Sequence, residues 1–442
     1  MDKNQTESVL EHNRRYIPGG ISSVNRAIDP PLAFVRGQGA YIWDTDGKRY
    51  IDYHAGFAPY FLGHNFAPIN DAAASQLSQG GESLFGAGPS RLEGELAELI
   101  CTHVPAVEKC TLLNTGSEAT SLAIRIARAV TGSSHIIVMQ GGYNGNHDEL
   151  ACNVFNTLAE IGPRVSPGEY PIRPLGAGSS ILHSRLVHAI NYNDLESVRY
   201  ICRRYPVAAL ITEPLLQNIG VVKPQAGFLE GLRKLADELG FLLIFDEVKT
   251  GFRHALGGYS EISGVKPDLV VYGKAVANGF PIAVVGGKAA HLDSIIHPDP
   301  AKRPFVAGTY NGHPVAVAAA IATVRHLADN KDKIYPEVEK MGRAMEAGIS
   351  NIFHRRGITA CVARQGSAFS YYFMKEPPKD LHDIIEGHDF TRDVALRRAL
   401  IERGVFFVPI ATKQCSLSAA HTAQDVAFTL EQFEAAVGTV LS

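Results

Sequence analysis

Short apolar runs alternate with longer amphipathic segments through the middle of the chain. Each run has the length of a strand that is buried on both faces, and each ends at turn residues or a polar break. The runs are residues 110–113 (CTLL), 135–139 (HIIVM), 207–211 (VAALI), 241–245 (FLLIF) and 268–272 (DLVVY). Strands that alternate with helices predict an α/β architecture with a mostly parallel sheet flanked by helices.

Helical periodicity accompanies these runs. Apolar side chains from Ala119 to Val130 recur three and four positions apart, which predicts a helix after the first strand. Residues 228–239 predict a second helix that leads into FLLIF, and helical patterns return from about Val315. Residues 153–180 are rich in Pro and Gly and show no clear period, so we interpret them as a functional lid.

The domain organisation follows from the length and from the absence of a linker. The 442 residues exceed what one hydrophobic core of ordinary size organises, so two or three packed units are expected. No internal repeat and no Pro- or Ser-rich linker divides the sequence. We therefore expect interleaved domains, with a large domain over 69–324 and a small α+β domain made from both chain ends, 1–68 and 325–442.

Composition and charge exclude several classes of protein. Lys and Arg total 42 against 45 for Asp and Glu, so nucleic acid and anionic membranes are not expected partners. The polar N-terminal residues lack the apolar stretch of a secretory signal, and no apolar run has the length of a membrane span. Six scattered cysteines without a CxxC pair favour reduced thiols over a disulfide frame or a zinc site. We expect a cytoplasmic enzyme.

Candidate chemistry gathers where the apolar runs end. Ligands of an open parallel sheet bind outside the carboxyl ends of its strands. The residues at these positions include a glycine turn that feeds a helix, an aromatic ring, four carboxylates and a lysine. They are the segments 114–119 (NTGSEA), 141–145 (GGYNG), 213–214 (EP), 246–248 (DEV) and 273–274 (GK). Such a set fits a cofactor that combines a phosphate with a pyridine ring.

Each of these signals also has an ordinary structural explanation. Gly116 and Ser117 open a helix, whose first N–H groups favour a phosphate, although Ser is also a common helix cap. Asp246 can hold a protonated pyridine nitrogen, or it can be a helix cap or a structural ion pair. Burial would lower the pKa of Lys274 and free a nucleophilic amine, whereas most lysines are surface charges. Tyr143 can stack on a ring or simply pack.

The ordered motifs NTGSEA, GGYNG, EP, DEVKTGFR, YGKAVANGFP and AGTYNGHP resemble those of class III aminotransferases, a branch of the fold type I pyridoxal 5′-phosphate (PLP) enzymes. Within that branch, the segments RRYIPGGISSVNRA and GAYIWDTDGKRYIDY and the residues 153–180 resemble the glutamate-1-semialdehyde aminomutase subgroup. The resemblance covers nearly the whole chain from about Tyr16 and implies PLP as the cofactor. Walker A, GxSxG and HExxH motifs are missing, and no metal is expected.

The resemblance implies roles for residues of the cofactor site. Lys274 would hold the cofactor as a Schiff base and shuttle the substrate proton, and Asp246 would hold the pyridinium proton. The other implied contacts are Gly116 and Ser117 at the phosphate, Tyr143 and Val248 on the two ring faces, and Asn218 near the ring hydroxyl with Glu213 behind it. Gly308 and Thr309 resemble the segment that reaches the phosphate of a neighbouring subunit, which implies a homodimer with shared active sites.

Two positions depart from the family pattern, and both bear on the site. The family usually has His after the stacking Tyr, whereas this chain has Asn144, which we keep among the cofactor contacts although it puts the role of that His in doubt. Lys413 stands where the aminomutase carries a glutamate near its substrate, so we expect a different substrate here. Arg26, with Ser23 beside it, aligns with an arginine near the aminomutase substrate, although a surface charge is an equal explanation. Phe57 is a further expected substrate contact.

The expected reaction is PLP-dependent transfer of an amino group from an amino acid or amine to a keto acid or aldehyde. The first alternatives keep the cofactor and change the reaction to that of an aminomutase, racemase or decarboxylase. A catalytically silent binding protein is disfavoured by the intact pair Lys274 and Asp246. A dinucleotide oxidoreductase is disfavoured because no GxGxxG follows an early strand. The fold does not name the substrate.

Overall fold

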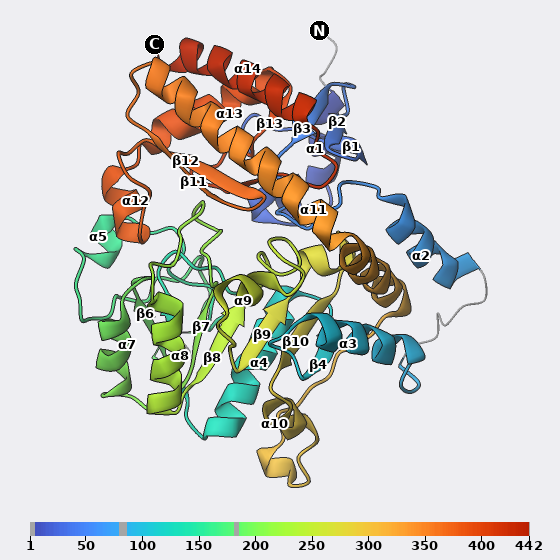
Figure 1. Cartoon of the computed structure of the whole chain (residues 1–442), viewed down its shortest axis with the longest axis vertical. Helices are drawn as coiled ribbons and strands as arrows, with labels where there is room; N and C mark the ends of the chain where they lie inside the picture. Colours follow the sequence, from blue (N-terminus) through green and yellow to red (C-terminus); the bar gives the residue numbers. More distant parts are fainter. Residues whose placement is uncertain (1–4, 79–85, 181–184, 442) are drawn as a thin grey trace. The chain divides into compact units, whose positions relative to one another are not determined.

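The computed structural model describes residues 5–78, 86–180 and 185–441 (Figure 1). The chain folds into two compact units. The end unit consists of Met1–Phe66, Glu337–Pro377 and His388–Ser442, and the central unit of Ala67–Pro336 and Pro378–Gly387. A single long helix, α11 (Pro314–Arg355), belongs to the central unit at its start and to the end unit at its finish. The domain bounds expected from the sequence stay a prediction.

A seven-stranded sheet in the order β4-β10-β9-β8-β7-β5-β6 forms the core of the central unit. Its strands are β4 (Lys109–Leu113), β5 (His135–Met139), β6 (Val187–Ile190), β7 (Val207–Thr212), β8 (Leu242–Asp246), β9 (Leu269–Tyr272) and β10 (Ala283–Gly287). The pairs from β9 to β6 are parallel, whereas β10 runs antiparallel to β4 and β9. All five strands expected from the apolar runs are present, and β6 and β10 are additional.

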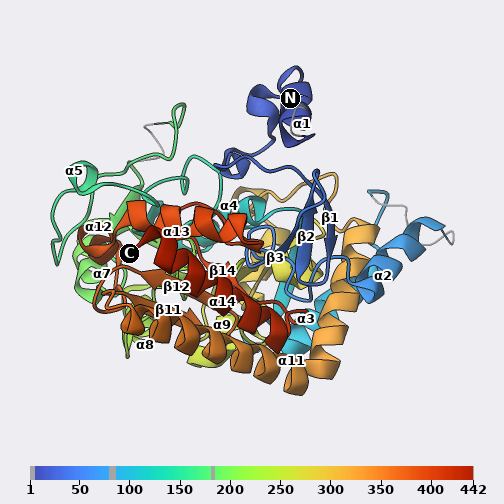
Figure 2. The same cartoon turned by 90° about the horizontal axis from the view of Figure 1, so that it is seen from above.

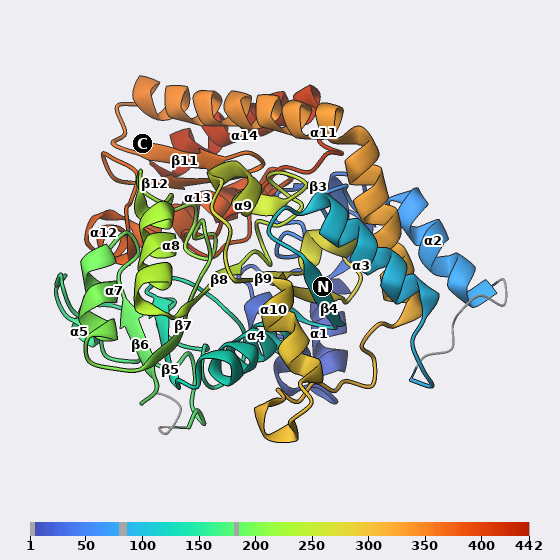
Figure 3. The same ribbon diagram turned by 60° about the horizontal axis from the view of Figure 1, so that its bottom comes forward.

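Helices cover both faces of this sheet. The connection through α4 (Gly116–Thr131) leads from β4 across the sheet to β5, whereas those through α7 (Leu195–Cys202) and α8 (Phe228–Leu239) step in the opposite direction. Because crossover connections are right-handed, helices of the two directions lie on opposite faces. Figure 3 shows α4 and α8 on opposite sides of the strands. Further helices of this unit are α2 (Ala67–Ser78), α3 (Arg91–His103), α5 (Leu158–Ile161), α9 (Gly258–Ser263), α10 (Ala289–Leu292) and α12 (Leu381–Gly387).

Local sequence fixes both ends of α4, the helix that begins at the expected phosphate site. Glu118 N donates to Thr115 Oγ1 (3.2 Å), and Thr115 N donates back to Glu118 Oε2 (3.1 Å), which makes a capping box. Gly132 ends the helix in the left-handed conformation with a φ of 68°. The helix therefore starts at Gly116, and its first N–H groups emerge at the edge of the sheet.

Residues 153–180 are held to the central unit at several points. Tyr170 is buried, and its backbone N donates to Ala189 O (2.9 Å). Arg164 Nη2 pairs with Asp380 Oδ1 (2.9 Å), which ties the segment to the start of α12. These contacts give a segment without periodicity a fixed course, and its role as a lid stays a prediction.

The two chain ends meet in the end unit. One sheet has the order β1-β2-β3-β13, and Val405 of β13 pairs in parallel with Ile51 of β3. A core of Ile42, Tyr50 and Phe406 packs beneath it, together with Ile401 and Val408. The strands of this sheet are β1 (Phe34–Gln38), β2 (Tyr41–Asp44), β3 (Arg49–Asp52) and β13 (Val405–Phe406).

A second sheet, three further helices and the part of α11 from Glu337 onward complete the described part of the end unit. The sheet is formed by β11 (Cys361–Gln365), β12 (Ala368–Tyr372) and β14 (Cys415–Ser416). The helices are α1 (Gln5–Arg14), α13 (Phe390–Glu402) and α14 (Ala423–Val440), and Figure 2 shows α13 and α14 side by side. Within the described ranges, no helix has both the length and the apolar character that crossing a bilayer requires.

Candidate active site

The sheet of the central unit has its topological switch point between β5 and β7. From β7 the chain proceeds to β8 and β9 on one side, whereas from β5 it proceeds to β6 on the other. Open α/β sheets bind ligands at such a point, outside the carboxyl ends of the strands. Tyr143 and Asn144 follow β5, Glu213 follows β7, and Asp246 ends β8. The sheet therefore delivers four of the expected cofactor residues to the edge where a ligand binds.

Asp246 is a buried carboxylate, 4% exposed, with a hydrogen bond to each oxygen. Asn144 Nδ2 donates to Asp246 Oδ2 (2.9 Å), and Val248 N donates to Asp246 Oδ1 (3.0 Å). Burial raises the pKa of Asp246, although both hydrogen bonds and the charges of Lys274 and Lys249 act to lower it. The amide of Asn144 is neutral, so it orients the carboxylate without supplying a full counter-charge. A protonated pyridine nitrogen would supply that charge.

Lys274 is separated from the end of β9 by Gly273 alone and opens the short 3₁₀ helix η3 (Lys274–Ala277). Its φ of 48° is a left-handed conformation that a lysine rarely adopts, and such strain concentrates at functional sites. Burial lowers the pKa of its ammonium, although the charges of Asp246 and Glu213 raise it. A lowered pKa favours the neutral amine, which is the form that reacts with a carbonyl carbon.

Glu213 joins the loops that follow β5 and β7. Its Oε1 accepts hydrogen bonds from Tyr143 N (3.1 Å) and Asn218 Nδ2 (2.9 Å), and its Oε2 accepts one from Gln217 N (3.0 Å). The carboxylate is 2% exposed, and burial raises its pKa while the charge of Lys249 lowers it. Tyr143, Asn218 and Glu213, each expected at the ring, therefore form one hydrogen-bonded group.

Val248 lies between the start of α4 and the residue before the lysine. A Cβ added to Gly116 would stand 3.0 Å from Val248 Cγ2, and one added to Gly273 would stand 3.3 Å from Val248 Cγ1. The side chains of Ser117 and Tyr143 share a hydrogen bond. The structure thus brings the expected phosphate residues next to both residues that are expected on the ring faces.

Gly308 and Thr309 are exposed at a pocket of about 580 Å³ in the central unit. Asn114 Nδ2 donates to Asn311 Oδ1 (2.9 Å), which tethers this turn beside the end of β4. Two large apolar side chains flank the turn, Phe305 at 75% and Tyr310 at 60% exposure. The lining residues are Gly86, Gly88, Pro89, Glu93, Gly308, Thr309 and Asn311.

The residues expected to bind substrate all belong to the end unit, on three separate segments. Ser23 directly precedes the short 3₁₀ helix η2 (Val24–Arg26), whose Arg26 is exposed. Phe57 has a φ of 70° within a turn whose four residues from Ala55 to Ala58 all have positive φ. Lys413 is buried, 7% exposed.

Three further charged residues of DEVKTGFR, Glu247, Lys249 and Arg253, are buried, and the sequence does not predict them as site residues. Glu247 accepts hydrogen bonds from Thr250 Oγ1 (2.8 Å) and Ser260 N (2.9 Å), and so fixes the loop after β8. Lys249 Nζ donates to Gln217 O (2.8 Å). The sequence did contain a signal for their burial. Charged residues that directly follow a fully apolar strand stand next to the buried core, and DEVKTGFR follows such a strand.

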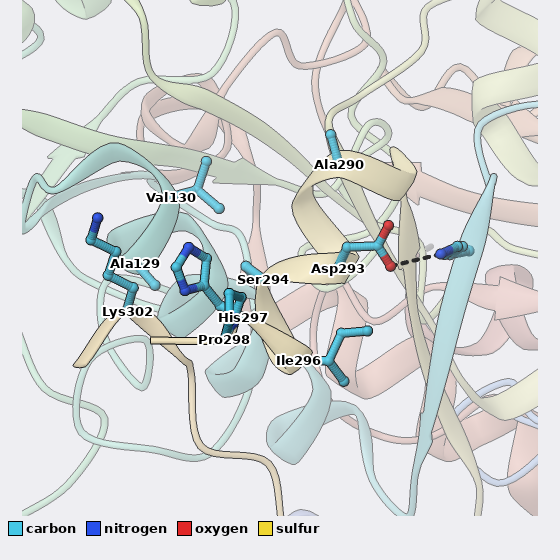
Figure 4. A pocket seen from close by; sticks show the side chains of 10 residues that line it. Ala129, Val130, Ala290, Asp293, Ser294, Ile296, His297, Pro298 and Lys302 are labelled. Carbon is cyan, nitrogen blue, oxygen red and sulfur yellow. Dashed lines mark hydrogen bonds and ion pairs between the residues drawn. The ribbon is translucent and has the colours of Figure 1, made fainter. Parts of the chain in front are cut away.

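A pocket of about 610 Å³ lies on another part of the central unit (Figure 4). Lys109 Nζ and Asp293 Oδ1 form an ion pair (2.7 Å) on one side, and Figure 4 shows His297 and Lys302 on the other. None of the residues expected at the cofactor is among its lining residues, which are Lys109, Ala129, Val130, Ala290, Asp293, Ser294, Ile296, His297, Pro298 and Lys302. Cavity size alone therefore does not mark the active site.

Comparison with known proteins supports the resemblance to class III aminotransferases. The family profile "Aminotransferase class-III" matches residues 23–437. A glutamate-1-semialdehyde 2,1-aminomutase of Acidobacterium capsulatum is 37% identical over 434 residues, which are 96% of this chain and 97% of that protein.

Solved structures of transaminases and aminomutases share the fold of this chain. An omega-transaminase from Sphaerobacter thermophilus has a TM-score of 0.90 at 28% identity, covering 100% of this chain and 99% of that one. A glutamate-1-semialdehyde aminomutase from Pseudomonas aeruginosa has a TM-score of 0.86 at 25% identity, covering 99% and 94%.

These likenesses confirm the expected fold, that of the fold type I PLP enzymes, and the expected cofactor. The residues of the central unit fit that cofactor, because a buried carboxylate, an amine of lowered pKa and a helix start meet at one edge of the sheet. The chain belongs to the class-III aminotransferases, a family of pyridoxal 5′-phosphate-dependent enzymes.

Proposed function

We propose that this chain moves the amino group of a small-molecule substrate, with PLP bound through Lys274 and its ring nitrogen facing Asp246. The observation that carries the proposal is the buried carboxylate of Asp246 beside Lys274, at the carboxyl ends of the neighbouring strands β8 and β9. When bound, PLP supplies an electron sink for the carbon that carries the amino group.

The chain's own side chains bind, orient and move protons. Lys274 Nζ takes the proton from the substrate carbon and returns it, which requires the neutral amine that burial favours. Asp246 keeps a proton on the ring nitrogen, and Asn144 holds Asp246 in place for this task. Gly116 and Ser117 bind the phosphate through the N–H groups of the first turn of α4.

Two forms of this chemistry fit the site. The curated relative from Acidobacterium capsulatum is an aminomutase, and this likeness favours an amino-group shift within one molecule over the transfer between two molecules that we expect from the sequence. Transfer stays a prediction, and the omega-transaminase structure supports it through the fold. Lys413 opposes glutamate-1-semialdehyde as the substrate, because it reverses the charge of the glutamate in the resembling subgroup.

A donor-only experiment separates the two forms. The pure holoenzyme is mixed with single amino acids or amines without any acceptor, and the cofactor spectrum and the products are followed. Transfer predicts conversion of the cofactor by the donor alone, with one equivalent of keto product. An aminomutase predicts many turnovers of one amino aldehyde to its isomer without a keto product. A protein that does neither with any substrate, including glutamate-1-semialdehyde, would overturn the proposal.

We further propose a homodimer in which Gly308 and Thr309 reach the phosphate of the neighbouring subunit. Phe305 and Tyr310 support this, because they expose large apolar surfaces on both sides of the turn. Apolar side chains gathered in this way mark surfaces that a partner covers.

A further inference from the structure

Lys249 is a buried lysine to which the mechanism above assigns no task. It is 8% exposed and stands three residues beyond Asp246 in the turn after β8. Its Nζ donates to Gln217 O (2.8 Å), while Gln217 N donates to Glu213 Oε2 (3.0 Å). The ammonium of Lys249 and the carboxylate of Glu213 thus hold the two ends of the same residue, so the positive charge is anchored at the loop that carries Glu213.

The carboxylates of Asp246 and Glu213 are close to each other. Asn144 Nδ2 donates to Asp246 Oδ2 (2.9 Å), and the N–H of the preceding residue, Tyr143, donates to Glu213 Oε1 (3.1 Å). Two adjacent residues therefore each contact one of the two acids, which places the acids near each other. Burial raises the pKa of each acid, and the charge of Asp246 raises the pKa of Glu213 further. Two buried acids at such close quarters remain ionised only if positive charge lies beside them.

Three groups besides Lys249 bear on this charge balance. The charge of Lys274 lowers the pKa of Asp246, but Lys274 is the group that joins the cofactor and exchanges a proton in each cycle. Arg253 is 1% exposed, and its charge lowers the pKa of Lys274. His254 Nε2 and Gln217 Nε2 share a hydrogen bond (2.7 Å). Tyr143 and Tyr192 also face the pair, and burial raises the pKa values of both.

We propose that Lys249 is the constant cation of this site, a positioning residue that keeps Asp246 and Glu213 ionised while the charge of Lys274 changes. It acts through Asp246 and needs no contact with substrate. Because Asp246 serves the ring nitrogen of the cofactor, the inference rests on the proposed function. Removing a fixed cation from a buried cluster favours the protonated form of every remaining member, so each titration in the site should move to higher pH.

The test compares Lys249→Met, which keeps the length and loses the charge, with Lys249→Arg, which keeps the charge. The readouts are the pH midpoint of the absorbance change of the holoenzyme and the affinity of the apoenzyme for PLP. We expect Lys249→Met to raise the midpoint by roughly one pH unit or more and to weaken PLP binding by about tenfold. Lys249→Arg should stay close to the parent protein. An unchanged midpoint in Lys249→Met, or an equal shift in both variants, would overturn the proposal.

A charge-balanced variant covers the case in which Lys249→Met does not fold. Glu213→Gln removes the opposite charge but also one acceptor oxygen, so the single variant Glu213→Gln is the reference for the double variant. If the charge of Lys249 is what matters, Lys249→Met should cost less stability in the Glu213→Gln background than in the parent protein. An equal cost in both backgrounds would refute the charge role. A parent protein that binds no PLP would refute the proposed function itself, whereas normal binding with an unshifted Lys249→Met refutes only this inference.

Discussion

The residues expected at the cofactor, in the central unit, and those expected at the substrate, in the end unit, are organised differently. In the central unit, strand ends converge at one edge of a sheet, and hydrogen bonds such as that from Asn144 to Asp246 fix the side chains. In the end unit, Arg26, Phe57 and Lys413 stand on three separate turns, one exposed, one half-buried and one buried. Parallel strands bring residues that follow them to one edge of the sheet, so their proximity can be inferred from the sequence. Residues on separate turns have no such common geometry. Changes in the central unit should therefore affect every substrate, whereas changes in the end unit should affect only some.

The largest expected effect is that of Lys274→Ala. If Lys274 moves the substrate proton as proposed, this variant lacks the amine that does so, and kcat should fall by at least about 10⁴-fold with every substrate. Steady-state kinetics with several donors measures the loss. Lys302→Ala, at an exposed lysine in the pocket of Figure 4, should behave like the parent protein. Activity of Lys274→Ala within tenfold of the parent would remove this lysine from the mechanism.

The second prediction compares two adjacent buried acids, Asp246 and Glu247, for which we expect different roles. Asp246→Asn keeps the shape but loses the charge that we propose serves the ring nitrogen, so we expect a rate loss of at least ~10²-fold with little change in Tm. Glu247→Gln should lower Tm, because that carboxylate accepts from Thr250 and Ser260, but the rate per folded molecule should be close to normal. Thermal unfolding and kcat of both variants give the answer. Near-normal turnover of Asp246→Asn would show that its carboxylate is only structural.

A smaller and selective effect is expected in the end unit. If Arg26 binds the carboxylate of the substrate, Arg26→Ala should lose roughly tenfold in kcat/KM with a carboxylate donor and little with a matched simple amine. Arg36→Ala is the control, because Arg36 is an exposed arginine of the same unit whose guanidinium lies over Trp43. Equal losses on both donors would mean that Arg26 supports the fold and recognises no carboxylate.

The smallest expected effect concerns the proposed dimer. If Thr309 reaches the phosphate of the neighbouring subunit, Thr309→Ala removes one hydroxyl there, so we expect PLP affinity to fall by about tenfold or less and the dimer to dissociate more readily on dilution. Cofactor titration and sedimentation measure the two quantities on one sample. A fully active monomer of the parent protein would exclude the shared site.

Most of the sheet could be predicted from the sequence, and the exceptions have physical reasons. In β6 the polar His188 interrupts the apolar pattern, and its burial depends on the bond between its Nδ1 and Glu169 Oε2 (2.6 Å). The strand β10 ends in Gly286 and Gly287, which are weak strand formers on their own. A Cβ on Gly286 would stand 2.8 Å from Val107, so a neighbouring side chain requires the glycine there. Contacts of this kind become visible only in three dimensions.

The residues of the candidate site also fall into those that the sequence predicts and those that it does not. Asp246 and Lys274 could be named because each follows a fully apolar strand, and parallel strands end at one edge. The burial of Lys249 and Glu247 depends on the course of the loop after β8, which no periodicity encodes. Nor does the sequence reveal that Lys413 is buried, because it lies in an irregular segment.

Borohydride reduction of the holoenzyme followed by peptide mapping tests the central claim most directly. The reduction joins PLP covalently to the lysine that holds it. We predict that the cofactor is found on the peptide that contains Lys274. Lys249 is the internal comparison, because it is also buried and lies close to Asp246. PLP attached to Lys249 or to any other lysine would contradict the account.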